Sequence, residues 1–199
     1  LATITLNRPE ARNALSEEMR ADLDAIIQDI KANAGDTVKA VLVTGAGHSF
    51  CAGGDVKAMN SPSRQDVIAG RARMRRSQTR LFELLNLEVP VIAAVNGHAA
   101  GAGFGLALMA DFIFAGPSTR FTCSFVRISL MPDWGLIYTL PRAVGMQQAK
   151  DIVFSGRRVY PEEAKSLGFV HTITATDQAL VPTAAAFARR FTNASTAAI

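Results

Sequence analysis

The amino-acid sequence predicts a mixed α/β fold built on parallel strands. Two apolar runs, residues 38–43 and 91–95, have the composition of strands buried on both faces of a sheet. Segments with the apolar spacing of helices alternate with such strands along the chain. A length of 199 residues, with 49% hydrophobic and 19% charged residues, is typical of a globular domain with a sizeable core. We therefore expect residues 1–199 to form a single α/β domain.

Local signals place the individual elements. Residues 2–7 alternate apolar and polar side chains, which predicts a strand, and residues 7–15 with Pro9 predict a loop. Ser16 is a good helix N-cap, so a helix is expected from there to about residue 32. The other expected elements are strand 38–43, helix 65–87, strand 91–95, a glycine-rich turn 96–103, helix 104–110, strands 112–115 and 120–123, a helix introduced by Pro132 and Asp133, helices 147–155 and 161–167, strand 169–173 and helix 176–190.

Composition limits the classes of function. The formal net charge of +4 and the pI of about 9.4 favour anionic ligands without requiring nucleic acid. Cys51 and Cys123 are too few for a disulfide framework, which indicates a reducing, cytoplasmic compartment. The three histidines lack metal-ligand spacing, so no metal is expected. No apolar run is long enough to span a bilayer, so no membrane partner is expected.

Two glycine-rich turns are the candidate functional segments. FCAGGDVK (residues 50–57) follows one buried strand, and HAAGAGFG (residues 98–105) follows the other. Parallel strands can bring such turns to one end of a sheet, where small residues let a ligand approach the backbone. One N–H group from each turn would then form an oxyanion hole. The alternative, that both turns need small residues only for tight packing, explains the same residues equally well.

Other motifs in these turns do not fit known sites. GAGHSF and GAGFGL lack the last glycine of the dinucleotide fingerprint, and the sequence contains no P-loop. Cys51 has no basic partner fixed beside it by the sequence, so we interpret it as a packing residue.

FCAGGDVKAM, VNGHAAGAGFGLALMAD and TITLNRPEARNAL resemble the crotonase, or enoyl-CoA hydratase/isomerase, superfamily. The match continues in order through FTCSFVRISLMPDWGLIYTLPRAVG and SGRRVYPEEAKSLGFVHTI, over nearly the whole chain. The resemblance implies a spiral of repeated ββα units, an acyl-CoA substrate with coenzyme A as part of that substrate rather than a cofactor, and homotrimers or hexamers. The family's C-terminal trimerisation helices are expected to be missing or truncated in this chain.

The resemblance also implies the residues of the site. The two oxyanion N–H groups fall on Gly54 and Ala102, in the two glycine-rich turns. The residues implied to contact the substrate or its CoA are Glu10, Ala11, Arg12, Ala52, Gly54, Asp55, Val56, Lys57, Gly101, Gly103, Phe125 and Trp134.

The acid and base groups depart from the hydratase pattern. Hydratases of the family use two glutamates, and their positions fall here on Gly105 and Phe125, which cannot activate water. Asp133 matches the position from which some isomerases of the family supply their base. One carboxylate can remove a proton from one carbon and return it two carbons away, and a dry pocket would raise its pKa. We therefore expect double-bond isomerisation with Asp133 as the base.

Three alternatives stay open. Aspartate after proline at a helix start is an ordinary N-cap, and the residues alone favour that role for Asp133. The chain could be an enoyl-CoA hydratase with atypical catalytic groups. It could also be a non-catalytic protein that binds acyl-CoA or RNA, because residues 71–80 carry five arginines. A solvated helix face explains those arginines as well, so nucleic acid is not the expected partner.

Overall fold

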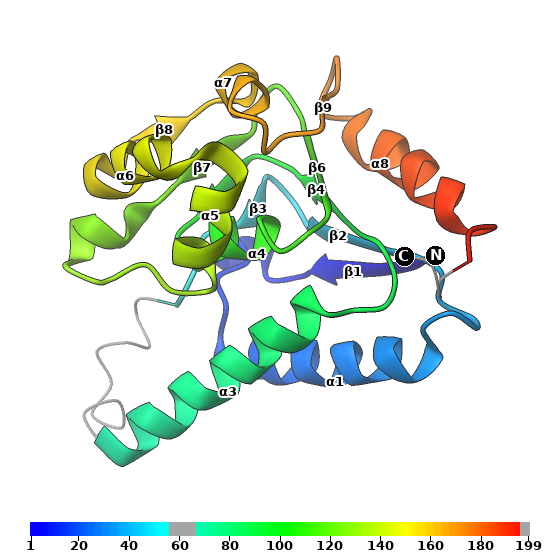
Figure 1. The fold of residues 1–199 in the computed structure, drawn as a ribbon, viewed down its shortest axis with the longest axis horizontal. Helices are drawn as coiled ribbons and strands as arrows, with labels where there is room; N and C mark the ends of the chain where they lie inside the picture. Colours follow the sequence, from blue (N-terminus) through cyan, green and yellow to red (C-terminus); the bar gives the residue numbers. More distant parts are fainter. Residues whose placement is uncertain (56–66, 196–199) are drawn as a thin grey trace.

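The computed structural model describes residues 1–55 and 67–195, and its strands form two sheets (Figure 1). The larger sheet is parallel throughout and has the order β1-β2-β4-β6-β9. Its strands are β1 (Ala2–Leu6), β2 (Val41–Gly45), β4 (Val91–Val95), β6 (Phe112–Ala115) and β9 (Thr172–Ile173). The smaller sheet has the order β3-β5-β7-β8, and only its β7–β8 pair is antiparallel. Its strands are β3 (Ser49–Cys51), β5 (His98–Ala100), β7 (Arg120–Thr122) and β8 (Arg158–Val159).

The chain repeats a ββα unit, as the sequence resemblance implied. In the pairs β2–β3, β4–β5 and β6–β7, the first strand joins the larger sheet and the second joins the smaller one. Each pair leads into a helix: α3 (Val67–Leu85), α4 (Ala102–Ala107) and the 3₁₀ helix η3 (Ser124–Ile128). Successive units therefore stack, and the turn after each strand of the smaller sheet emerges beside the turn of the preceding unit.

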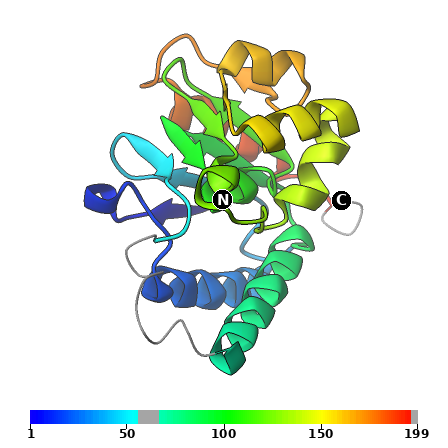
Figure 2. The ribbon, with the colours of Figure 1, turned by 90° about the vertical axis from the view of Figure 1, so that its left-hand side faces the viewer.

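The larger sheet is buried on both of its faces. Val43 and Ala93 belong to the main core, which also contains the apolar residues of α1 (Glu17–Asn33). Leu42 and Ile92 point to the other face and pack with Leu180 in α8 (Leu180–Ala188). The views in Figures 1 and 2 place α1 and α3 together on one side of the molecule, away from α8. This double burial accounts for the apolar character of both central strands, although β2 begins at Val41 and not at the predicted residue 38.

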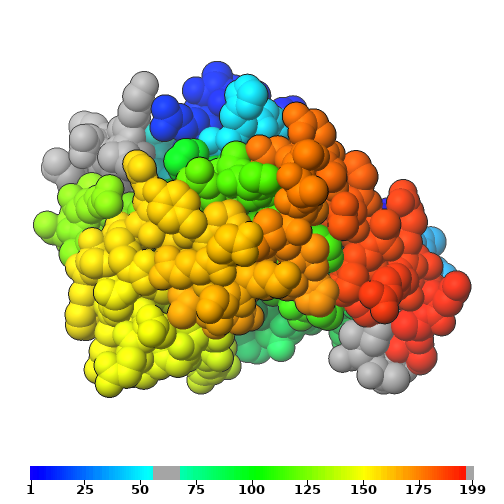
Figure 3. All heavy atoms as spheres, turned by 90° about the horizontal axis from the view of Figure 1, so that it is seen from above, coloured from blue at the N-terminus to red at the C-terminus, as the bar shows by residue number. Residues whose placement is uncertain are grey.

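The remaining described helices are η1 (Pro9–Ala11), α5 (Leu136–Val144), α6 (Met146–Ser155), α7 (Pro161–Ser166) and η4 (Arg189–Phe191). Those after η1 pack on one another and on neighbouring elements: α5 on α4 and α6, α6 on η3, α7 on β9 and η4 on α8. Figure 3 shows the last part of the chain, coloured yellow to red, spread over one face of the molecule. Within the described ranges, no helix is both long enough and apolar enough to cross a membrane.

Most expected elements are present, with three informative differences. Ser16 caps α1 as predicted, because its Oγ accepts a hydrogen bond from the Met19 N–H at 3.2 Å. The short strands β3 and β5 overlap the glycine-rich segments 50–57 and 96–103, which were expected to be turns. The glycine and alanine residues around β3 and β5 favour a turn and hide these short strands, whereas the equally short β7 was predicted. The third difference is the start of α5, which concerns Asp133 and is described with the site.

Candidate functional site

The structure brings the two glycine-rich turns into contact. β3 and β5 pair in parallel with Cys51 opposite Ala99, so the two turns follow at the same edge. A Cβ atom added to Gly53 would lie 2.7 Å from the Ala100 carbonyl oxygen and 3.3 Å from the Ala102 nitrogen. A Cβ atom on Gly103 would collide with the backbone of Cys51. The small residues of both turns are therefore required by close backbone approach.

The two predicted oxyanion donors lie in this contact region. In the turns and loops of residues 1–55 and 67–195, no backbone hydrogen bond uses the N–H of Gly54 or Ala102 as its donor. Ala102 is the first residue of α4, where a helix leaves its N–H groups without intrahelical partners. The preceding glycines, Gly53 and Gly101, both have positive φ values, 95° and 52°. Both N–H groups thus belong to the turns that the structure brings together, and their role as oxyanion donors stays a prediction.

The predicted CoA-contacting segment at residues 10–12 lies against the first turn. The Ala52 N–H donates to the Arg12 carbonyl oxygen at 2.9 Å, and the Leu15 N–H donates to Gly53 at 2.8 Å. Arg12 has a left-handed backbone, which ends η1 and turns the chain toward residue 13. Glu10 and Arg12 are exposed beside the turn, and Ala11 is half-buried. These hydrogen bonds place residues 10–12 next to the turn that contains Gly54.

Asn13 and Arg8 hold this region together, and sequence reasoning did not identify either of them. The fully buried Asn13 amide donates to the carbonyl oxygens of Ala46 and Ser49, at 2.9 and 2.6 Å. The Arg8 guanidinium lies 3.4 Å from the Asp55 carboxylate. The sequence signal that could have identified Asn13 is an amide side chain between Arg12 and Ala14, in the loop that follows Pro9. Val56 and Lys57, also predicted to contact CoA, lie outside the described residues.

Phe125 and Trp134 border the second turn. A Cβ atom on Gly101 would touch the Phe125 ring at 3.7 Å, and Phe125 is 7% exposed. A Cβ atom on Gly105 would collide with the Trp134 backbone and approach the Trp134 Cβ to 2.9 Å. Trp134 itself is buried, as expected for a core residue. The two positions where hydratases carry glutamate are thus a packed glycine and a buried phenylalanine ring.

Asp133 does not cap a helix, so that prediction from the residues alone is wrong. The helix α5 begins at Leu136 and its N-cap is Gly135. Trp134 and Gly135 both adopt positive φ values, 51° and 69°, which turns the chain for two further residues before the helix starts. The Asp133 side chain is therefore available for another role.

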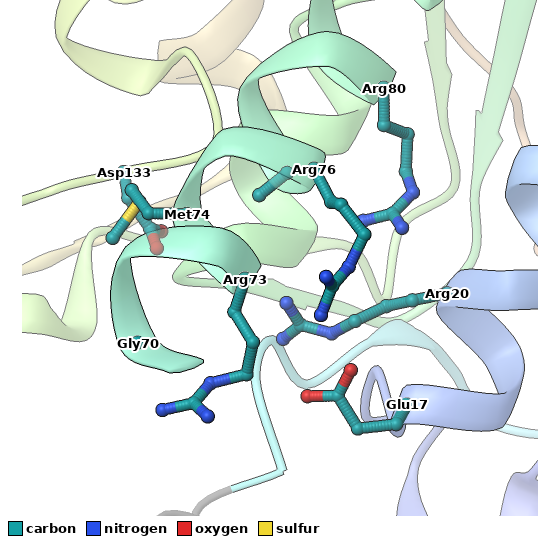
Figure 4. Close-up of a pocket in the computed structure, with 9 residues that line it drawn as sticks. Glu17, Arg20, Gly70, Arg73, Met74, Arg76, Arg80 and Asp133 are labelled. Atoms are coloured by element: carbon teal, nitrogen blue, oxygen red, sulfur yellow. The ribbon is translucent and has the colours of Figure 1, made fainter. Parts of the chain in front are cut away.

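Asp133 instead lines a cavity of about 370 Å³ between α1 and α3 (Figure 4). The other lining residues are Glu17, Arg20, Gly70, Arg73, Met74, Arg76, Ser77 and Arg80. Although Asp133 has considerable exposed surface, the protein atoms around its carboxyl group remove part of its hydration. This desolvation raises the pKa of Asp133, and the nearby Arg20 guanidinium opposes the increase.

The cysteines have the character of packing residues. Cys51 and Cys123 are both fully buried, and burial raises the pKa of each thiol to about 11. A thiol with so high a pKa is a poor nucleophile at neutral pH. In the part of the chain that the structure describes, no group of three or more His, Cys, Asp or Glu side chains is arranged to hold a metal ion.

Comparison with known proteins identifies the family. A family model described as enoyl-CoA hydratase/isomerase matches residues 1–199. The chain is 37% identical over 188 residues to 1,2-epoxyphenylacetyl-CoA isomerase from Escherichia coli (strain K12), covering 94% of this chain and 71% of that protein. It is 36% identical over 175 residues to short-chain-enoyl-CoA hydratase from Clostridium acetobutylicum, covering 87% of this chain and 65% of that protein. The chain therefore belongs to the enoyl-CoA hydratase/isomerase family of the crotonase superfamily.

Solved structures give the same result. The crystal structure of an enoyl-CoA hydratase/isomerase from Cupriavidus metallidurans CH34 superposes with a TM-score of 0.88 at 35% identity. That match covers 96% of this chain and 70% of the other. The chain thus has the crotonase fold and spans about two thirds of the length of these relatives.

Proposed function

We propose that this protein isomerises a carbon–carbon double bond in an enoyl-CoA thioester, with Asp133 as the base. The observation that carries the proposal is that Asp133 lines a cavity and precedes Trp134, which packs against the helix that begins with Ala102. Gly54 and Ala102 offer N–H groups at the contact of the two turns. Asp133 is joined to the same region through Trp134, which packs against Gly105 in α4.

The proposed reaction moves one proton. The Asp133 carboxylate removes a proton from C2 of a 3-enoyl thioester, and the electron pair of that C–H bond delocalises onto the thioester oxygen. The N–H groups of Gly54 and Ala102 stabilise the resulting enolate oxygen. Asp133 then returns the proton to C4, so the double bond moves from C3–C4 to C2–C3. The raised pKa of Asp133 favours this role, because the group must both accept and release a proton.

Hydration is the alternative reaction, because one similar protein is a short-chain-enoyl-CoA hydratase. The two positions that would hold the hydratase glutamates are Gly105 and Phe125. Glu17 is a second carboxylate on the cavity that contains Asp133. Figure 4 shows Glu17 at the opposite end from Asp133, with arginine side chains between them. This separation does not favour one water shared by both carboxylates.

A paired product assay tests the proposal. The protein is incubated in heavy water with a trans-2-enoyl-CoA in one sample and a 3-enoyl-CoA in the other, and the products are analysed by mass spectrometry. We expect the 3-enoyl ester to become its 2-enoyl isomer with no water added, and with deuterium incorporated to the extent that the proton held by Asp133 exchanges with solvent before its return to C4. Rapid addition of one water to the 2-enoyl ester would instead establish a hydratase and reject Asp133 as a simple proton shuttle.

We also propose that the protein works as a homotrimer or hexamer. Exposed apolar side chains occur on η3, on the segment that follows it and at the start of α5: Val126, Ile128, Leu130, Met131, Ile137 and Tyr138. An exposed apolar surface of this kind is typical of a subunit contact. Light scattering after size exclusion measures the assembly directly, and a monomer at working concentration would reject the proposal.

A further inference from the structure

The cavity beside Asp133 is more cationic than a hydrocarbon chain requires. Arginines supply four of its lining residues, while Glu17 and Asp133 are the acidic ones. An apolar acyl chain is better accommodated by apolar side chains, because a guanidinium next to hydrocarbon loses hydration without gaining a partner. A cavity lined mainly by one sign of charge concentrates ligands of the opposite sign. Its composition therefore indicates a ligand that is partly anionic.

Helix α3 presents its arginines to this cavity selectively. Arg73, Ser77 and Arg80 follow Gly70 at intervals of three, four and three residues, which places them on one face of a helix. Arg76 borders the same face, whereas Arg71 and Arg75 are exposed and do not line the cavity. The five arginines of residues 71–80 are thus divided between the cavity and solvent.

Two of the four cavity arginines have structural roles. Arg80 is 5% exposed and makes a two-point ion pair with the Asp24 carboxylate, one contact of which is 2.6 Å. The guanidinium carbons of Arg80 and Arg20 lie 5.9 and 5.5 Å from the centroid of the Trp134 ring. These contacts fix Trp134, and with it Asp133, against the cationic wall.

Arg76 is the cavity arginine best placed to meet a ligand. Its side chain is exposed, and none of the ion pairs among the described residues involves it. Figure 4 shows Arg76 of α3 and Arg20 of α1 reaching toward each other, with Arg73 lower on the same helix. Asp133 lies on the far side of α3 from Glu17 in this view. Asp133 and these guanidinium groups line the same cavity, so a ligand that fills the cavity would reach both.

We propose that the acyl group of the substrate ends in a carboxylate, and that Arg76, assisted by Arg73, binds this carboxylate. The proposal rests on the proposed function, because it takes Asp133 as the reaction centre of an acyl-CoA thioester. A guanidinium offers two parallel N–H donors that match a carboxylate, which makes arginine selective for such a group. The phosphates of CoA are also anionic and could bind the same arginines. The experiment therefore distinguishes an acyl carboxylate from a CoA phosphate.

The test compares two 3-enoyl-CoA esters of equal chain length, of which one has a terminal carboxylate. We expect the wild-type protein to have the higher kcat/KM for the carboxylated ester. Arg76→Gln is expected to lower that preference about tenfold, the effect of losing one charge-assisted hydrogen bond. Arg76→Glu is expected to reverse it by repulsion. Arg75→Gln, on the same helix but off the cavity, is the matched control and keeps the preference.

Thioesters of pantetheine, which lack the nucleotide and its phosphates, identify which anion the arginines bind. If Arg76 binds the acyl carboxylate, the preference and its loss in Arg76→Gln persist with pantetheine esters. If Arg76 binds a CoA phosphate, the variant weakens both CoA esters alike and affects neither pantetheine ester, and the proposal is overturned.

Calorimetry with saturated esters separates failure of this proposal from failure of the isomerase function. If neither 3-enoyl ester is isomerised, the proposed reaction is wrong. Tighter binding of the carboxylated saturated ester, lost in Arg76→Gln, would still support the anion site. Equal affinities for the two saturated esters would reject the anion site whatever the reaction.

Discussion

Gly105 in α4 packs directly against the backbone of Trp134, so closely that a Cβ atom on Gly105 would lie 2.9 Å from the Trp134 Cβ and collide with the Trp134 carbonyl oxygen. This contact has a consequence for the chemistry of the family. Gly105 stands at the position implied to carry a catalytic glutamate in hydratases of the family. The space that a side chain would need there is filled by the segment that carries Asp133 and Trp134. A side chain longer than glycine at residue 105 would therefore displace the segment that carries Asp133.

Gly105→Glu is accordingly expected to destabilise the protein without creating hydratase activity. A side chain at this position must displace backbone, and overpacking of this kind costs about 1–3 kcal/mol of unfolding free energy. Urea unfolding of Gly105→Ala and Gly105→Glu measures the loss. Gly70→Ala in α3 is the matched control, because its Cβ would meet only the flexible end of Arg73 at 3.6 Å. That control is expected to be stabilising by about 0.5–1 kcal/mol. Hydratase activity in Gly105→Glu would contradict the packing argument.

Asp133→Asn is expected to abolish isomerisation while leaving the fold intact. Asparagine keeps the shape of the side chain but cannot accept the substrate proton, and removal of a general base lowers rates by about 10²–10⁴-fold. Because Asp133 does not cap α5, the variant should unfold at the same temperature as the wild type or slightly higher. Exchange of the C2 proton of a 3-enoyl-CoA in heavy water measures the reaction. Unchanged exchange in the variant would show that another group is the base.

The pH dependence of activity and the pH dependence of stability should both reflect the ionisation of Asp133. Desolvation raises its pKa above the ordinary value of 3.8, so kcat/KM should fall as the pH falls through this raised value. The effect on stability has the opposite sign. A carboxyl group with a raised pKa binds protons more tightly in the folded state, so it lowers stability at neutral pH and ceases to do so as the pH falls.

Comparison of the wild type with Asp133→Asn isolates this contribution. We expect the variant to be the more stable protein at pH 7, and the difference to shrink as the pH falls through the raised pKa toward 3.8. Denaturant unfolding at several pH values measures it. A variant that is less stable than the wild type at pH 7 would mean that Asp133 is a satisfied structural carboxylate.

The sequence predicted those features that depend on local pattern. The buried strands β4 and β6 coincide with the predicted ranges 91–95 and 112–115, since continuous apolar runs mark them. The meeting of the two glycine-rich turns also followed from parallel strands alone. Features that depend on tertiary packing were not predicted. The cationic cavity forms where Arg20 of α1 meets the arginines of α3, which lie far away in the sequence.

Asp133 illustrates how local propensity can mislead. Proline followed by aspartate ordinarily starts a helix, and on that basis the residue is an N-cap. The burial of Trp134 against Gly105 imposes a left-handed backbone at residue 134 instead, and the helix begins later. The resemblance to the family assigns Asp133 a catalytic role instead, and that role stays a prediction.

The predicted oxyanion role of Ala102 can be tested by removing one hydrogen-bond donor, its backbone N–H. Ala102 is the first residue of α4, where proline is compatible with a helix because the N–H makes no intrahelical bond. Ala102→Pro removes that N–H, and loss of one oxyanion donor typically lowers the rate by about 10²–10³-fold. Ala102→Gly keeps the N–H group and is the matched control, with activity expected within a few-fold of the wild type.

The two variants must be compared in kcat and in substrate affinity, with folding checked by circular dichroism. An oxyanion donor acts mainly on the enolate-like transition state, so Ala102→Pro should lower kcat far more than it weakens binding of a saturated acyl-CoA. If both variants lose activity equally, the position matters for packing against Gly53 rather than for its N–H. If a well-folded Ala102→Pro retains its full rate, the second oxyanion donor must be sought on another residue of the Gly101–Gly105 turn.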